Sequence, residues 1–267
     1  MDNAPDPDPV RDLRLAIMPL GDHLDELRRR ILVGLGTFAA VFVLCLALGS
    51  QVFAYVRWPL DRAVASMDLA PAQAERLARW HVLGPVDGFA ALAKFSFFLA
   101  LALSLPVLLY QVWLFVKPGL KRAERRAVLP IVQFASVMFL AGALVGFFLA
   151  APLGLRWLYW FNAWLGVESI WTAARTIAFI QSVCIGFGLA FELPLAIMAL
   201  GRTGLVRPAT LRRYRRHAIV VMALLGAVFT PPDPATQVML AALLYGLYEV
   251  GILLMRPKKQ KDGHDNC

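Results

Sequence analysis

The sequence predicts an all-α integral membrane protein with six transmembrane helices. Hydrophobic residues make up 59% of the 267 residues, and the mean hydropathy of +0.63 excludes an ordinary soluble domain. Long stretches with at most one charged residue recur along the chain, and a helix needs about 20 apolar residues to cross a bilayer core. The six candidate spans lie within residues 31–56, 95–116, 127–155, 176–201, 217–232 and 234–255.

The Lys and Arg residues lie mostly on one side of these spans. Twenty of the 27 fall in the two terminal tails and in residues 116–127 and 201–217, and seven fall in the alternate loops. Cytoplasmic segments of membrane proteins carry such an excess of positive charge. The bias predicts that both termini are cytoplasmic, and it accounts for the net charge of +9 without a nucleic-acid partner.

A single membrane domain is expected over residues 20–256. Residues 1–19 are predicted to be disordered because their Pro-rich, charged start has little to bury, and residues 257–267 form a charged cytoplasmic tail. An amphipathic helix leading into the first span is predicted by four apolar residues that share one helical face: Leu20, Leu24, Leu27 and Ile31.

The last two spans are expected to be short. His217–Phe229 rises only about 20 Å against a hydrocarbon core of about 30 Å. The hairpin at residues 230–235 is therefore expected to lie below the outer membrane surface. On the same side, the aromatic stretch Arg156–Leu165 is expected to form an interfacial helix.

Prolines within the spans favour kinked helices and a curved assembly, because they free backbone carbonyls and bend the axis. Structural roles are assigned to five residues: Pro59, Pro106, Pro118, Pro194 and Asp233.

No catalytic or metal-binding motif is found in the sequence. It lacks the G-x-S-x-G, H-E-x-x-H and Walker-type phosphate-loop patterns, and no Cys/His spacing suits a metal. We therefore expect no enzyme activity, no cofactor and no metal ion.

Three acidic residues are candidates for function. Glu192 lies inside the fourth span, about 12 Å from its cytoplasmic end, where a charge is costly and indicates a functional site. One interpretation is that Glu192 binds a proton or contacts substrate in a polar recess. The other is that it is hydrogen-bonded to backbone carbonyls freed by Pro194. Glu26 and Glu124 lie on the basic face. One interpretation is that each forms an ordinary surface ion pair, such as Glu26 with Arg30. The other is that the two carboxylates together bind guanidinium groups.

Four motifs in order along the chain make it resemble the TatC family, the polytopic receptor subunit of the twin-arginine protein translocase. The resemblance covers Leu20 to Arg256. The motifs are His23–Arg28; Leu105–Phe115 with Pro118–Leu120 and Glu124–Arg126; Phe187–Pro194; and Thr230–Asp233 with Gln237.

The resemblance implies a receptor that binds twin-arginine signal peptides of folded cargo proteins and nucleates a translocation complex driven by the proton-motive force. It implies a concave cup of six helices in the bacterial inner membrane, single-span TatA and TatB partners, and self-association. Glu26 and Glu124 match the family's signal-peptide site, to which we add the motif residues Arg28, Phe115 and Arg125. Glu192 matches an intramembrane glutamate of the family.

A proton-coupled secondary transporter of a small solute, with Glu192 as carrier, is the alternative function. Such folds often contain internal repeats and broken helices at matching positions. The six unequal spans show no such halves, and the cytoplasmic acidic pair would have no role. An intramembrane protease would need a nucleophile or an acidic dyad that the sequence lacks.

Thr230 and Gln237 are predicted to dock a partner helix at the edge formed by the last two spans. Lipid cannot satisfy their polar groups at this depth, whereas a polar residue of a neighbouring helix can. The alternative is that Gln237 bonds a carbonyl freed by the nearby prolines within this chain.

The predicted orientation is tested by labelling single cysteines in intact cells and in inverted vesicles with an impermeant thiol reagent. Cysteines within 116–127 or 201–217 are expected to react only from the cytoplasm, and those within 151–175 only from outside. A map that requires an odd number of spans would contradict the orientation.

Overall fold

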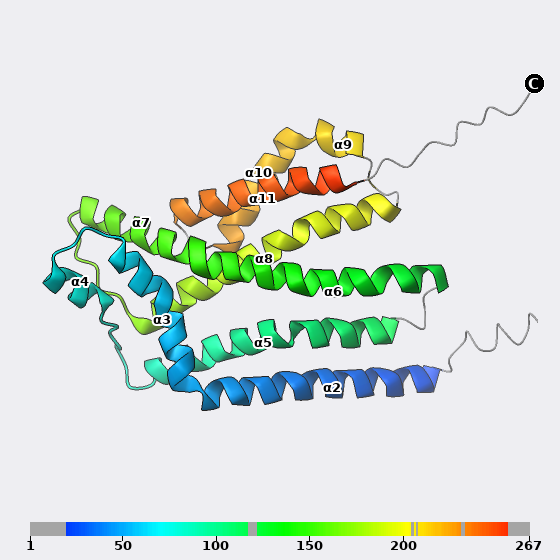
Figure 1. The fold of residues 1–267 in the computed structure, drawn as a ribbon, viewed down its shortest axis with the longest axis horizontal. Coiled ribbons are helices and arrows are strands. Elements are labelled where there is room, and N and C mark those ends of the chain that lie inside the picture. Colours follow the sequence, from blue (N-terminus) through cyan, green and yellow to red (C-terminus); the bar gives the residue numbers. More distant parts are fainter. Residues whose placement is uncertain (1–19, 117–121, 204–205, 207, 231–232, 256–267) are drawn as a thin grey trace, which may run out of the picture. The chain divides into compact units, whose positions relative to one another are not determined.

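The structure, a computed structural model, describes residues 20–116, 122–203, 206, 208–230 and 233–255. Over these residues it is helical, with no strand and one isolated bridge between His81 and Thr172 (Figure 1). The all-α prediction is therefore confirmed. The predicted tails, 1–19 and 257–267, and Pro118 lie outside the described residues.

The helices are named as in Figure 1. Their bounds are α2 Leu20–Ala47, α3 Gly49–Ala65, α4 Pro71–Ala78, α5 Asp87–Val116, α6 Arg122–Val145, the π-turn η2 Gly146–Ala150, α7 Ala151–Trp164, α8 Ala173–Thr203, α9 Pro208–Arg213, α10 Arg215–Phe229 and α11 Pro234–Leu254.

Five helical segments of the described chain are long and apolar enough to cross a bilayer: 24–47, 87–115, 132–164, 173–201 and 234–254. The remaining predicted span is α10, which has 15 residues and is short, as the sequence predicts. The 21 residues of α11 make it shorter than α2, α5 and α8, but its rise of about 31 Å still matches the core.

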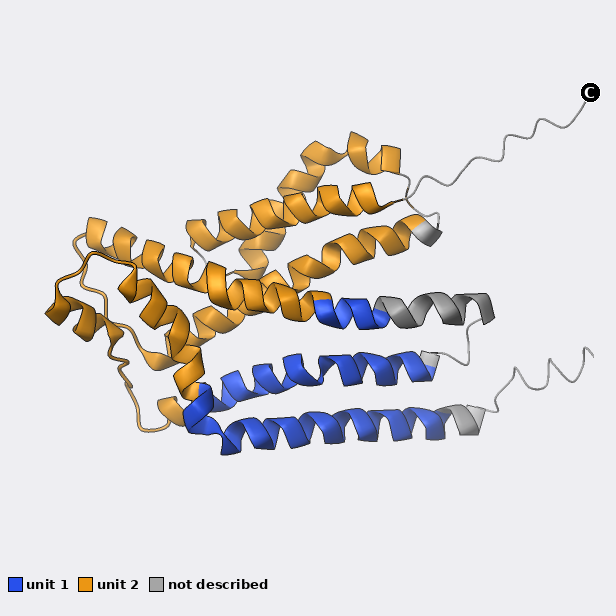
Figure 2. Ribbon diagram, viewed as in Figure 1, with its two compact units in different colours: residues 1–52, 92–137 blue, residues 53–91, 138–267 orange. Residues whose placement is uncertain are grey.

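The chain divides into two compact units, which are described separately (Figure 2). Unit 1 comprises residues 1–52 and 92–137, and unit 2 comprises residues 53–91 and 138–267.

In unit 1, α2 lies beside α5 and is held there by apolar contacts. Phe97 of α5 packs edge-on against Phe38 and Phe42 of α2, with ring centroids 5.0 and 6.1 Å apart. Gly34 brings the α2 backbone close to Leu108, because a Cβ at Gly34 would lie 3.1 Å from the Leu108 side chain. These contacts join segments about 60–75 residues apart in the sequence, so they position the unit 1 surface discussed below.

In unit 2, α8 packs against α7, η2, α10 and α11. Its buried face includes Ile177, Ile180 and Val183, and Leu240 of α11 is fully buried in the same unit. Asp233 caps the start of α11: its carboxylate accepts from the Thr236 amide at 2.8 Å and from the Thr236 hydroxyl. A side-chain acceptor at this position satisfies an amide that the helix leaves unpaired.

Residues 156–164 are helical, as expected, but they do not form a separate helix. The structure instead continues α6 through η2 into α7, which ends only at Trp164. Pro152 is the residue that suggests a break, because a proline ring clashes with the carbonyl four residues earlier in an α-helix. The wider π-turn ends just before it, with the Ala151 amide bonded to the Gly146 carbonyl, so the helix passes this proline without ending.

Small residues let α6 and α8 approach closely. A Cβ on Gly142 would lie 2.4 Å from the Phe187 carbonyl oxygen, and a Cβ on Gly146 would lie 3.1 Å from the Cys184 Cα. A Cβ on Gly188 of α8 would lie 2.8 Å from the Phe139 ring, so this glycine also makes room for a close contact. The Gly142-x-x-x-Gly146 pair is therefore a helix-packing motif here.

Gly142→Ala is expected to destabilise the protein, because backbone must move to make room for the new methyl group. The loss is about 1–3 kcal/mol, observed as a lower unfolding temperature of the purified protein in detergent. Gly246→Ala in α11 is the matched control, since no atom lies within 4 Å of its Cβ position. Both changes gain helix propensity, so equal stability of the two variants would contradict the packing argument.

Candidate functional site

Glu26 takes part in a polar network on unit 1. Its carboxylate accepts from Arg30 Nε at 2.7 Å, and the two side chains are 25% and 24% exposed. Arg30 also donates to the Gln111 side-chain oxygen of α5, over 3.4 Å. The ion pair at i and i+4 that the sequence allows is present, and it is linked to the neighbouring helix.

An apolar groove begins beside this network. It has a volume of about 400 Å³ and runs between α2 and α5. Arg30 and Gln111 provide its polar end, and its walls are apolar: Leu27, Ile31, Phe38, Leu101, Leu108 and Phe115 are among them. A carboxylate paired with an arginine of the same helix therefore lies next to an apolar groove.

The structure describes the side chains of some predicted site residues and not of others. Phe115 lines the groove, and Arg28 is exposed on α2. Glu124 and Arg125 lie in the first turn of α6, but their side chains lie outside the described part of the chain. The pairing of Glu26 with Glu124 thus stays a prediction.

Glu192 is half-buried in α8, two residues before Pro194. Its side chain lies against the backbone of Phe139 in α6. The ring of Phe139 in turn packs on Gly188, one turn earlier in α8. Glu192 is therefore placed at the close contact between α6 and α8.

Thr230 and Gln237 are bonded within the chain. The Thr230 side chain is 5% exposed, and its hydroxyl donates to the Gly226 carbonyl at 2.7 Å. Gln237 is half-buried and donates to the Ala223 carbonyl of α10 over 3.4 Å. Both side chains thus bond to carbonyls of α10. The Thr230 hydroxyl no longer requires an outside partner, whereas the long Gln237 bond leaves room for one.

The three prolines assigned structural roles within the described residues lie inside helices: Pro59 in α3, Pro106 in α5 and Pro194 in α8. Near Pro106, Ser104 is buried, and its hydroxyl donates to the Ala100 carbonyl at 2.7 Å.

Sequence reasoning missed Gln111 and the groove. Gln111 lies 81 residues from Arg30 along the chain, and the groove forms only because α2 and α5 pack together. The LPVLLYQVWLF motif does contain both Gln111 and Phe115, so the motif was the available signal.

Comparison with known proteins identifies relatives over most of the chain. The family model for the Sec-independent protein translocase protein (TatC) matches residues 22–242. The TatC protein of Helicobacter pylori strain J99 is 32% identical over 252 residues, covering 92% of this chain and 94% of that protein. The TatC protein of Campylobacter jejuni is 34% identical over 237 residues, covering 89% and 93%.

Solved structures agree with these relatives. A crystal structure of the twin-arginine translocase receptor TatC in DDM superposes with a TM-score of 0.70 at 29% identity, covering 88% of this chain and all of that one. A second crystal structure of this receptor gives a TM-score of 0.68, also at 29% identity, with 87% and 97% covered.

Proposed function

Because the chain belongs to the TatC family of Sec-independent protein translocase proteins, we propose that it is the receptor that binds twin-arginine signal peptides of folded cargo. The observation that carries this proposal is the Glu26 carboxylate at the polar end of the apolar groove on unit 1. A signal peptide has a positively charged segment followed by 7–15 apolar residues. The site presents the complementary features in the same order.

Recognition of the two arginines is assigned to Glu26 and Glu124, with Arg28, Phe115 and Arg125 around them. A guanidinium bonded to a carboxylate contributes about 1.5–3 kcal/mol, and its planar fork rewards arginine over lysine. Glu26 must exchange Arg30 for an arginine of the peptide. An i to i+4 pair of this kind is worth only about 0.3–0.5 kcal/mol, so the exchange costs little.

The apolar part of the peptide is assigned to the groove. From Leu27 to Phe38 the groove follows α2 over a rise of about 16 Å. A helical segment of 7–15 residues is about 10–22 Å long, so the two lengths match. The basic residues around the site would repel a positively charged peptide whose side chains do not reach Glu26 and Glu124.

The proposal also covers the location, the partners and the energy source of this receptor. The chain lies in the bacterial inner membrane with both termini in the cytoplasm, self-associates, and works with the single-span TatA and TatB subunits under the proton-motive force. Glu192 is its intramembrane polar site. The alternative of a small-solute transporter finds no support, because the relatives and solved structures compared above carry the TatC name.

Glu124→Ala is expected to abolish or strongly reduce crosslinking of a twin-arginine peptide, and Glu26→Ala to reduce it less, because Arg30 already neutralises Glu26. A twin-lysine peptide provides the background signal. Glu75→Ala is the matched control, since Glu75 forms an i to i+4 pair with Arg79 and neither residue lines the groove. Unchanged crosslinking in both variants would contradict the assignment of Glu26 and Glu124 to the signal-peptide site.

Partner docking at the α10–α11 edge is tested by Thr230→Val combined with Gln237→Leu. Less of the single-span subunit is expected to copurify, because the long Gln237 bond leaves room for a polar group of the partner, which lipid cannot replace. Signal-peptide crosslinking is expected to stay unchanged. Thr37→Val with Gln133→Leu is the control, because Thr37 also donates to the carbonyl four residues earlier. Full recovery of the partner with the first double variant would place the docking surface elsewhere.

A further inference from the structure

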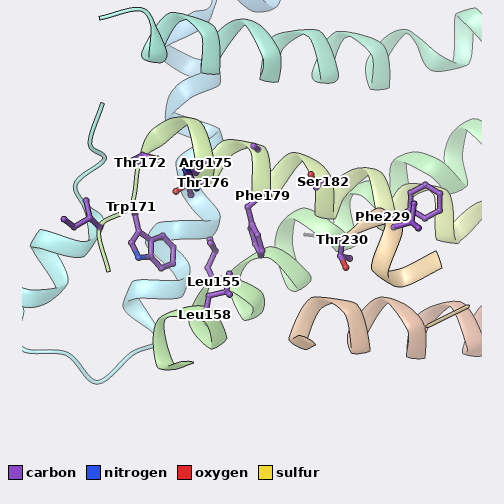
Figure 3. A pocket seen from close by; sticks show the side chains of 13 residues that line it. Leu155, Leu158, Trp171, Thr172, Arg175, Thr176, Phe179, Ser182, Phe229 and Thr230 are labelled. Carbon is purple, nitrogen blue, oxygen red and sulfur yellow. The ribbon is translucent and has the colours of Figure 1, made fainter. Parts of the chain in front are cut away.

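A second cavity lies within unit 2, and none of the residues assigned to the signal peptide lines it. It has a volume of about 540 Å³ and is open to its surroundings. Its walls come from α7, from the segment that precedes α8, from the first three turns of α8, and from the end of α10 (Figure 3). Of the residues that line it, only Thr230 has a part in the proposed function.

The polar lining of this cavity consists of hydrogen-bond donors, of which Thr230 already donates to the Gly226 carbonyl. Arg175 is exposed and forms no ion pair with any residue that the structure describes. The Thr172 hydroxyl is buried and lacks a hydrogen-bond partner in the described chain. Thr176 is 6% exposed and Ser182 lies further along the same helix. No acidic residue lines the cavity, so the site is positively charged.

The rest of the lining is apolar and lies on the inner side of these donors. Leu155, Phe179 and Val228 belong to it, and Figure 3 shows Leu155 and Phe179 on the side of α8 that faces α7. Ser182 follows Arg175 by seven residues, which corresponds to about 10 Å along the helix. Arg175, the one charged residue of the lining, therefore lies near the start of α8, and the lining from there to Ser182 is uncharged.

The depth of Arg175 matches the headgroup layer. The 31 residues of α8 rise about 46 Å, more than the hydrocarbon core of about 30 Å, so a helix centred in the bilayer has its first turn outside that core. Trp171, which lines the cavity just before α8, is of the type that concentrates at this level. A ligand here would have its charge at the headgroups and its apolar part among the acyl chains.

We propose that this cavity binds an anionic membrane phospholipid through its phosphate. Arg175 pairs with the phosphate, the hydroxyls of Thr172 and Thr176 donate to its oxygens, and an acyl chain lies against Leu155, Phe179 and Val228. A phosphate group accepts several hydrogen bonds at once and carries the charge that the lining lacks. The apolar wall gives a reason for a lipid rather than a free phosphate ion, because a free ion would leave it uncovered.

The test measures phosphatidylglycerol binding to the full-length purified protein by native mass spectrometry. Zwitterionic phosphatidylcholine is the comparison, because its choline cation offsets the phosphate charge. Phosphatidylglycerol is expected to bind more tightly, and Arg175→Gln to weaken it by about tenfold, the effect of losing one charge-assisted hydrogen bond. Thr172→Val with Thr176→Val is the second variant, expected to weaken binding without a change of charge. Arg156→Gln is the matched control, an exposed arginine of α7 outside the cavity.

Three results would overturn the proposal. Equal binding of the two lipids, unchanged by Arg175→Gln, would show that no headgroup site exists. Displacement of the lipid by inorganic phosphate at the same concentration would assign the site to a free anion. Crosslinking from a photoreactive residue at position 228 to a protein rather than a lipid, in intact membranes, would assign it to a partner helix.

Discussion

The hydrocarbon core offers no hydrogen-bond partner to a polypeptide backbone, and the fold follows from that constraint. The chain meets it with continuous helices and with local solutions where helices begin or change. Asp233 satisfies the free amide at the start of α11. The Thr230 hydroxyl donates to a carbonyl of α10. The π-turn η2 lets the helix continue past Pro152. Within this frame α8 packs against α7, η2, α10 and α11, and Glu192 lies beside Phe139 of α6.

Charge and shape separate the two candidate binding surfaces. On unit 1 an acidic residue stands among arginines at the end of an apolar groove, a combination that selects cationic amphipathic segments. On unit 2 an arginine stands among hydroxyls at the end of an apolar cavity, a combination that selects anionic amphipathic molecules. The two surfaces thus differ in the sign of the charge they accept, while both use the apolar surroundings of the membrane to hold the remainder of the ligand.

Local features of the fold were predictable from the sequence, and contacts between distant segments were not. Hydropathy located the spans and the shortness of α10, because both depend on composition over about 20 residues. The spacing of Glu26 and Arg30 allowed their ion pair. Gln111 joined that network only through helix packing, which no periodicity reveals. The continuity of α6 with α7 was not predictable, because a π-turn beside a proline leaves no mark in composition.

The Glu26–Arg30 pair has a consequence for how such a receptor would respond to salt. A peptide arginine that takes the place of Arg30 forms one ion pair while another is lost, so the number of ion pairs at Glu26 does not change. Screening then acts on both sides of the equilibrium and largely cancels. An exchange site of this kind would keep its preference for arginine over a wide range of ionic strength, whereas the rate of encounter, which depends on unpaired charges, would still fall as salt rises.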